Sequence, residues 1–162
     1  MKQFKVALNI FFLLIIAVGC NNIKSKKANE YCSHNRSENP EITKNIKLFF
    51  EKYRSDGPVK AVDFISATNK LISSGDQIAS LKVKLDSLHH KLGNYRGYGQ
   101  ITRKYVADDL YLCSYLVKYE RQPLRFVFIF YRPDKNWILQ SFSFDTDVVS
   151  ELEESGKIYL IE

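Results

Sequence analysis

Two histidines stand side by side in this 162-residue chain, His89 and His90, and their imidazoles could do acid–base chemistry. Either could form an acid–base pair with Asp63 or Asp145 if the fold brings the groups within hydrogen-bond reach. Neighbouring residues of a helix point about 100° apart, so the two rings are poorly placed to share a metal, and no further ligands occur at suitable spacing. The sequence therefore predicts no metal site and no cofactor, with solvated or helix-capping histidines as the alternative to catalysis.

Motifs that build common active sites are absent from the sequence. It has no phosphate-binding glycine loop, no G-x-S-x-G elbow and no Cys-x-x-Cys pair. Arg125 and Arg132 alternate with aromatic residues and could bind an acid at a pocket mouth, or they could pair with the surface carboxylates Glu120 or Asp134. The candidates for lining a pocket are aromatic and basic side chains of the second half of the chain: Tyr98, Tyr115, Arg125 and Trp137. The absence of catalytic motifs favours a binding or interaction module over an enzyme.

The first twenty residues have the parts of an export signal. A basic start is followed by an apolar run over 6–18, broken only by Asn9, and then by Ala17-Val-Gly-Cys20. The apolar run is shorter than the roughly 20 residues needed to cross a bilayer, and it has the length of a signal-peptide core. Small residues before a cysteine resemble the lipobox of bacterial lipoproteins, although Ala17 stands where that family prefers leucine. The alternative is an ordinary signal peptide in which Cys20 has no special role.

The lipoprotein resemblance implies a signal peptide at 1–19, an acylated Cys20 and a membrane anchor through N-terminal lipid, because several acyl chains together hold a protein stably. Asn21 after the cysteine is similar to the residue found in lipoproteins sorted to the outer membrane. The lysines after it are unlike acidic surface-export signals. We therefore expect a protein of the bacterial cell envelope, anchored to the outer membrane and facing the periplasm.

Charge and composition limit the partners of such a protein. The formal net charge is +6, and +4 without Lys2 and Lys5 of the signal, which is a mild excess. Basic and aromatic residues interleave between Tyr95 and Tyr105, as on nucleic-acid surfaces. An exported protein rarely meets nucleic acid, so we predict no nucleic-acid partner. No motif of the sequence specifies a small-molecule ligand.

The chain divides into the signal, a tether and one domain. Residues 20–40 are polar with almost no apolar periodicity, which predicts a flexible tether after the lipidated cysteine, and 41–162 form the domain. Cys32 of the tether and Cys113 of the domain could form a disulfide in an oxidising compartment. The alternative is a buried Cys113 thiol and a free Cys32.

Three helices are predicted before any strand. Apolar residues three or four apart give an amphipathic helix over 41–54, a shorter one over 59–73 after Gly57-Pro58, and a leucine-rich one that ends at Leu92 with Gly93 as its cap. Each helix has an apolar stripe, so the three must pack against the strands predicted in the second half of the chain. An acidic helical segment and an apolar end are expected over 148–161.

Strands are predicted over 94–106, 110–119, 124–131 and 137–144, with turns at Asp108-Asp109, Gln122-Pro123 and Pro133–Asn136. Side chains alternate across a strand, so Phe126 and Phe128 share one face of the third strand while Val127 and Ile129 share the other. Neither face is polar. We therefore expect the helices to cover one face and a partner, such as a second copy in a homodimer, to cover part of the other.

Helices followed by a meander of long strands predict an α+β domain with three N-terminal helices on a curved antiparallel sheet of about four strands. This order, and the phrases Ala61-Val-Asp-Phe-Ile-Ser-Ala-Thr-Asn69, Tyr115-Leu-Val-Lys-Tyr-Glu-Arg-Gln-Pro-Leu-Arg-Phe126 and Phe130-Tyr-Arg-Pro133, resemble uncharacterised bacterial members of the nuclear-transport-factor-2-like family, over about 41–147. The resemblance implies a cone-shaped, cystatin-like roll.

Members of that family include isomerases, dehydratases, small-ligand binders and dimerising modules, so the fold alone does not decide the function. The catalytic tyrosine and aspartate of the steroid-isomerase branch do not align with this sequence, so the resemblance assigns no catalytic residue here. The first hypothesis is a lipid-anchored envelope binding or interaction module without catalysis. The alternative is a small-ligand carrier, or an isomerase- or dehydratase-like enzyme that uses the pocket of the cone.

Overall fold

Five apolar side chains at helical spacing form the buried stripe of α2 (Pro40–Ser55), as the sequence predicts. The helix begins where Asn39 Oδ1 accepts hydrogen bonds from the backbone N–H groups of Glu41 and Ile42, at 3.1 and 3.2 Å. Such a cap satisfies amide groups that have no partner within the helix. The buried residues are Ile42, Ile46, Phe49, Phe50 and Tyr53.

The computed structural model describes residues 32–33 and 38–158, with side-chain surroundings described for 38–153. The predicted signal, Cys20 and the apolar end of the chain lie outside these residues. All described residues belong to one compact unit, 31–162. The remaining helices are α3 (Pro58–Ser66), α4 (Lys70–Ser73), α5 (Asp76–Leu92) and α6 (Val148–Ile158), and the strands are β1 (Cys32–Ser33), β2 (Tyr95–Val106), β3 (Leu110–Tyr119), β4 (Leu124–Tyr131) and β5 (Ile138–Asp145).

The second predicted helix is divided into α3 and α4. Between them, Thr68 Oγ1 accepts a hydrogen bond from the backbone N–H of Leu139 at 3.0 Å, and Asn69 Nδ2 donates to the Leu139 carbonyl at 2.9 Å. Asn69 also caps α4 by accepting from the N–H of Leu71. Threonine and asparagine side chains compete with helical hydrogen bonds in this way, so the helix is interrupted where it meets β5.

The strands form one antiparallel sheet in the order β1-β2-β3-β4-β5, in which each strand pairs with its neighbours in sequence. The four long strands agree closely with the predicted ones, and the three predicted turns join them. The fold is thus α+β with the helices α2–α5 before the long strands. The short β1 corrects the prediction of an unstructured tether at Cys32 and Ser33, because these residues pair with Val106 and Tyr105 of β2.

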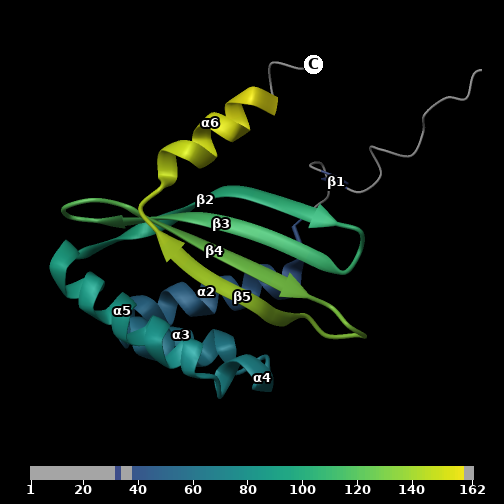
Figure 1. Cartoon of the computed structure of the whole chain (residues 1–162), viewed down its shortest axis with the longest axis horizontal. Coiled ribbons are helices and arrows are strands. Elements are labelled where there is room, and N and C mark those ends of the chain that lie inside the picture. Colours follow the sequence, from purple (N-terminus) through teal and green to yellow (C-terminus); the bar gives the residue numbers. More distant parts are fainter. Residues whose placement is uncertain (1–31, 34–37, 159–162) are drawn as a thin grey trace, which may run out of the picture. The chain divides into compact units, whose positions relative to one another are not determined.

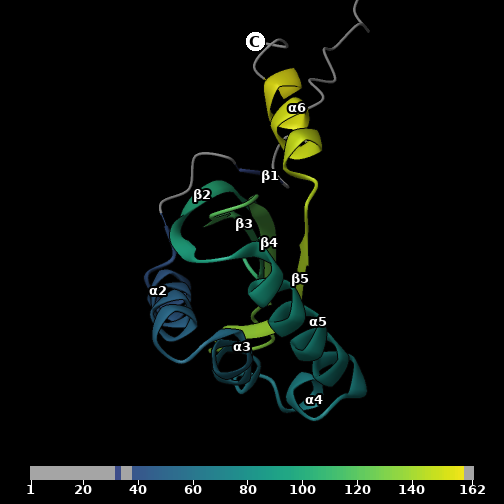
Figure 2. The same cartoon turned by 90° about the vertical axis from the view of Figure 1, so that its left-hand side faces the viewer.

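Helices cover one face of the sheet, which we call the inner face (Figures 1 and 2). Phe49 of α2 reaches it directly, with ring centroids 5.1 Å from Phe128 and 5.7 Å from Phe142. Alternate residues of β3 and β4 complete this core, as the sequence alternation predicts, and they are buried: Tyr111, Cys113, Tyr115, Val117, Tyr119, Leu124, Phe126, Phe128 and Phe130. An edge-to-face network of aromatic rings therefore fills the space between α2 and the sheet.

The helix α5 ends at Gly93, where φ is +80°. A Cβ at this position would lie 3.0 Å from Oε2 of Glu120, whose carboxylate accepts hydrogen bonds from Asn94 and Arg96. Both the left-handed backbone and the close carboxylate require glycine here. The predicted cap is confirmed, and it fixes the turn from α5 into β2.

The candidate disulfide is not formed, because Cys113 is a free, fully buried thiol. Cys32 lies in β1 and Cys113 in β3, with β2 between them. Strands are about 4.8 Å apart, so two strands separated by a third are about 10 Å apart, beyond the roughly 7 Å that a disulfide can bridge between Cα atoms. The alternative prediction of a packed Cys113 is confirmed.

Candidate functional site

The four residues predicted to line a pocket do not meet in one cavity. Tyr98 stacks on Phe50 with ring centroids 3.7 Å apart, and Tyr115 meets the same ring edge-on at 5.4 Å. Trp137 lies elsewhere, against Tyr111 at 6.4 Å. Tyr115 belongs to the buried core, whereas Tyr98 is 37% exposed at its edge, so these two rings pack around Phe50 and do not line an open cavity there.

Arg125 lies on the opposite side of the sheet, which we call the outer face. Its guanidinium donates to the Asp145 carboxylate at 2.8 and 3.0 Å and to Glu151 of α6 at 3.4 Å. These carboxylates raise the pKa of the arginine above its ordinary value, with the hydrogen bonds to Asp145 as the main cause. The interpretation of Arg125 as a paired surface arginine is supported, with different carboxylates from those predicted.

Arg132 is also paired, with Asp109 at 3.1 Å rather than with Asp134. Its guanidinium lies over the ring of Trp137, 5.1 Å from the centroid. Glu120 pairs with Arg96. The two arginines therefore stabilise strand ends and turns through carboxylates of the described residues.

The acid–base pairs proposed from the sequence are not formed. Asp63 is bound to Lys82 at 2.8 Å, and Asp145 is bound to Arg125. The His90 side chain is exposed, and its Nε2 lies 3.8 Å from Oδ2 of Asp86, one turn earlier in α5. This agrees with the prediction of a solvated histidine. The imidazole of His89 has a different and unforeseen partner.

His89 takes part in a chain of hydroxyl groups at one end of the core. Its Nδ1 lies 3.0 Å from the Tyr119 hydroxyl, which is hydrogen-bonded to the Tyr53 hydroxyl. Burial is the main cause that lowers the pKa of His89, and the neighbouring His90 lowers it further. This favours a neutral ring whose Nδ1 accepts a hydrogen bond from the Tyr119 hydroxyl. Burial raises the pKa of Tyr119 to about 12, and both phenols stay protonated near neutral pH.

This cluster borders a surface hollow of about 580 Å³. The Tyr95 hydroxyl is buried beside it without a hydrogen-bond partner among the described residues. A neutral imidazole next to phenols can hold or relay a proton, but no carboxylate faces His89 as an orienting partner within the described hydrogen bonds. Sequence spacing could not reveal the cluster, because Tyr53, His89 and Tyr119 come from three separate elements.

The outer face carries a group of apolar side chains that no helix covers completely. On this face, Leu110 pairs across the strands with Tyr131, and Leu112 pairs with Ile129. Val106 of β2 pairs with Leu110, and Ile138 of β5 pairs with Tyr131, at the end of the sheet where the β2–β3 turn lies. Tyr131 and Val106 are each 40% exposed, and the others are half-buried. We call these six residues the outer patch: Val106, Leu110, Leu112, Ile129, Tyr131 and Ile138.

The helix α6 contacts the outer face at the other end of the sheet. Glu151 accepts a hydrogen bond from Ser114 and pairs with Arg125, so one polar clamp fixes the start of the helix. Val149 and Leu152 of α6 remain 65% and 56% exposed. The described side chains of α6, 148–153, are thus held by polar contacts and do not cover the outer patch.

Within the described residues, no group of three His, Cys, Asp or Glu side chains could hold a metal, and no helix is long and apolar enough to span a bilayer. Comparison of the chain with protein-family models, characterised proteins and solved structures finds no match. The geometry of the chain itself must therefore carry any functional proposal.

Proposed function

We propose that this protein is a lipid-anchored module of the bacterial envelope that binds a protein partner, in the first instance a second copy, through the outer patch. The observation that carries the proposal is the apolar, partly exposed outer face of β3 and β4. Soluble domains rarely expose contiguous apolar surface unless it binds something. The aromatic rings that fill the space between α2 and the sheet add support, since a carrier or enzyme of the cone type needs an open cavity there.

The outer patch is suited to a symmetric interface. Its apolar side chains stand on a rigid sheet, and the aromatic Tyr131 is of the residue type enriched at the centre of protein interfaces. Lys104 of β2 pairs with Leu112 at the margin, and the exposed Ser141 of β5 pairs with Ile129, so polar groups border the patch. A twofold axis through the patch would place apolar side chains against their own copies.

The fold and location belong to the same proposal. Helices before a curved antiparallel meander support a roll of the nuclear-transport-factor-2-like type. The basic, apolar and small-residue parts of residues 1–20 support acylation at Cys20, an outer-membrane anchor and a domain that faces the periplasm. Dimerisation between chains anchored in one membrane gains from their high effective concentration.

The interface is tested by sedimentation equilibrium of the full chain in detergent. Tyr131→Lys and Val106→Lys each place a charge in the outer patch at a position exposed enough to leave folding intact. We expect each to raise the dimer dissociation constant by about tenfold or more, because an unpaired charge must be desolvated. The matched control is Leu71→Lys, since Leu71 is 88% exposed on α4. A chain that stays monomeric and crosslinks to no partner contradicts the proposal.

The anchor is tested separately by growing cells that express the full chain with an alkyne-labelled fatty acid. We expect label on the wild-type chain and none on Cys20→Ala, which should also leave the membrane fraction. Equal labelling of both chains, or none of either, rules out acylation at Cys20.

A further inference from the structure

The strand β5 forms one edge of the sheet, and its edge is only partly protected. In the described part of the chain it pairs with β4 alone. Thr68 and Asn69 satisfy the outward backbone groups of Leu139, but no described side chain hydrogen-bonds to the backbone of residues 140–144. Alternate residues of an edge strand offer unpaired N–H and C=O groups, which can accept another strand.

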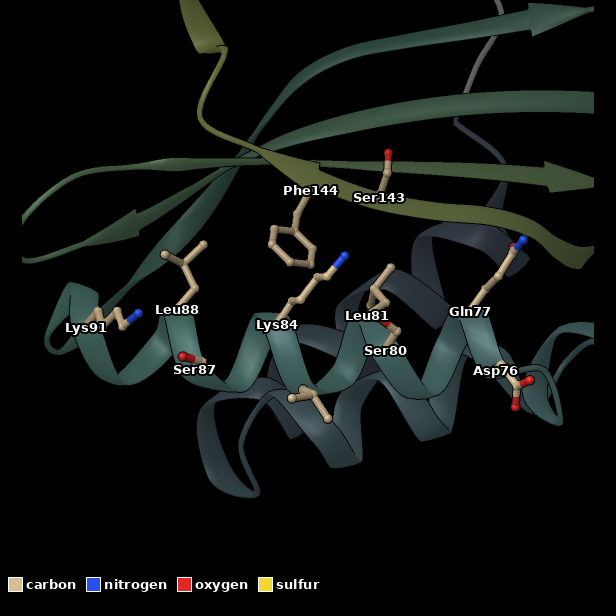
Figure 3. A pocket seen from close by; sticks show the side chains of 11 residues that line it. Asp76, Gln77, Ser80, Leu81, Lys84, Ser87, Leu88, Lys91, Ser143 and Phe144 are labelled. Carbon is tan, nitrogen blue, oxygen red and sulfur yellow. The ribbon is translucent and has the colours of Figure 1, made fainter.

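A groove runs beside this edge, between β5 and α5. It consists of two adjoining hollows of about 980 and 440 Å³ that share Gln77 and Leu81. Figure 3 shows Leu81 and Leu88 rising from α5 toward the sheet, and Phe144 reaching from β5 toward the helix. These three side chains are half-buried and packed against the core, so the groove has an apolar floor next to a strand edge.

Two lysines of α5 give the groove its charge. Lys84 points from the helix toward β5, between Leu81 and Leu88, and Lys91 lies near the end of the groove (Figure 3). Neither ammonium group has an ion-pair partner among the described residues, whereas the neighbouring Lys82 is bound to Asp63. The single acidic residue that lines the groove, Asp76, is at the start of α5.

We propose that this groove binds an extended segment of another protein, which joins the sheet as a strand beside β5 and carries the pattern apolar–x–acidic–x–apolar. Strand addition supplies backbone hydrogen bonds, and the side-chain pattern supplies specificity. The two apolar residues contact Leu81 and Leu88, and the acidic residue between them meets Lys84.

Helix and strand dimensions are compatible with this pattern. Leu81, Lys84 and Leu88 are separated by about 4.5 and 6 Å along the helix axis. Residues i and i+4 of a strand are about 13 Å apart, about 3 Å more than the distance between Leu81 and Leu88 along the helix axis. Each apolar contact therefore needs a shift of only about 1.5 Å, which leucine side chains span, and the long lysine side chain reaches the central acidic residue. Because the pattern is symmetric, it fits a strand added in either direction.

A second copy of this chain fits the groove poorly. The strand β5 of a second copy has no acidic residue before Asp145 at its end. A symmetric β5–β5 pairing would also bring the Lys84 side chains of both copies to one interface, where like charges repel. The groove is therefore separate from the dimer proposed for the outer patch.

The test measures binding of synthetic peptides to the full chain in detergent by fluorescence anisotropy. The probe contains Val-Thr-Glu-Thr-Val with glycine–serine flanks, and a second peptide has lysine in place of glutamate. We expect the glutamate peptide to bind at least about fivefold more tightly, since charge contacts at a partly exposed site are modest. Lys84→Glu should reverse this preference, while Lys44→Glu, a matched reversal on an exposed lysine of α2, should leave it unchanged.

Backbone pairing is tested with the glutamate peptide N-methylated at alternate residues, which should abolish binding in at least one of the two methylation registers. Val106→Lys, on the outer patch, should leave peptide binding unchanged, so failure of the dimer and failure of the groove can be told apart. The proposal is overturned if the peptide does not bind, if Lys84→Glu leaves the preference intact, or if both methylated peptides bind normally. It is also overturned if Lys84→Glu abolishes the dimer, because a second copy then occupies the groove. Peptide binding that requires removal of residues 159–162 overturns it too, because the end of the chain itself then occupies the groove.

Discussion

Truncation of Phe128 to alanine tests whether the interior of this domain is filled. Its ring is fully buried in β4, with centroids 4.8 Å from Phe142, 5.1 Å from Phe49 and 6.0 Å from Tyr115. Loss of the ring forfeits about 2 kcal/mol of transfer free energy. A cavity of about 100 Å³ adds about 2 kcal/mol when its walls do not collapse. We expect Phe128→Ala to lower the free energy of unfolding by about 4 kcal/mol.

The assay is urea unfolding followed by circular dichroism on the full chain with Cys20→Ser as the parent. The control Leu71→Ala, at a highly exposed position, should change the free energy of unfolding by less than about 0.5 kcal/mol. If Phe128→Ala costs less than about 1.5 kcal/mol with an unchanged m-value, the ring faces open space. That result would refute the filled interior and favour a pocket for a small ligand.

Local geometry at Gly93, His89 and Cys113 gives three further predictions. Gly93→Ala should lower the free energy of unfolding by about 1–2 kcal/mol in the same urea assay, because a Cβ there meets a positive φ and the Glu120 carboxylate. The folded-state pKa of His89 is lowered from its ordinary 6.5, so its contribution to stability should be full above pH 6.5 and lost as pH falls through the folded-state pKa. In thermal melts, the melting temperature of His89→Gln should therefore fall less on acidification than that of the control His90→Gln. Burial raises the pKa of the Cys113 thiol, so in a chain with Cys20→Ser and Cys32→Ser it should react with a maleimide only after unfolding; rapid labelling of the native chain would contradict its burial.

Much of the fold could be predicted from the spacing of apolar residues along the sequence alone. The stripe Ile42, Ile46, Phe49, Phe50 and Tyr53 has the spacing of a helix, and the alternation in β4 separates Phe126 from Val127 as it does in the sheet. Both patterns are local, and each shows which face of its helix or strand is buried. The break between α3 and α4 was missed, because it depends on Thr68 and Asn69 meeting Leu139 about seventy residues later.

The candidate site was harder to predict for the same reason. Tyr98 and Trp137, which have suitable side chains for a pocket, lie in separate places: Tyr98 is partly exposed against Phe50, and Trp137 packs at a turn against Tyr111. The contact of His89 with Tyr119 depends on how α5 crosses the sheet, which no sequence spacing encodes. Only the two-sided apolar character of β4 was visible beforehand, and the outer patch results from it.

Native mass spectrometry of the chain purified from a bacterial envelope tests the central claim most directly. We predict an acylated dimer that carries no small molecule beyond its lipid, converted to monomer by Tyr131→Lys. A monomer that retains a small molecule would contradict the account, since it would show that the chain binds a ligand in a pocket and not a protein on the outer patch.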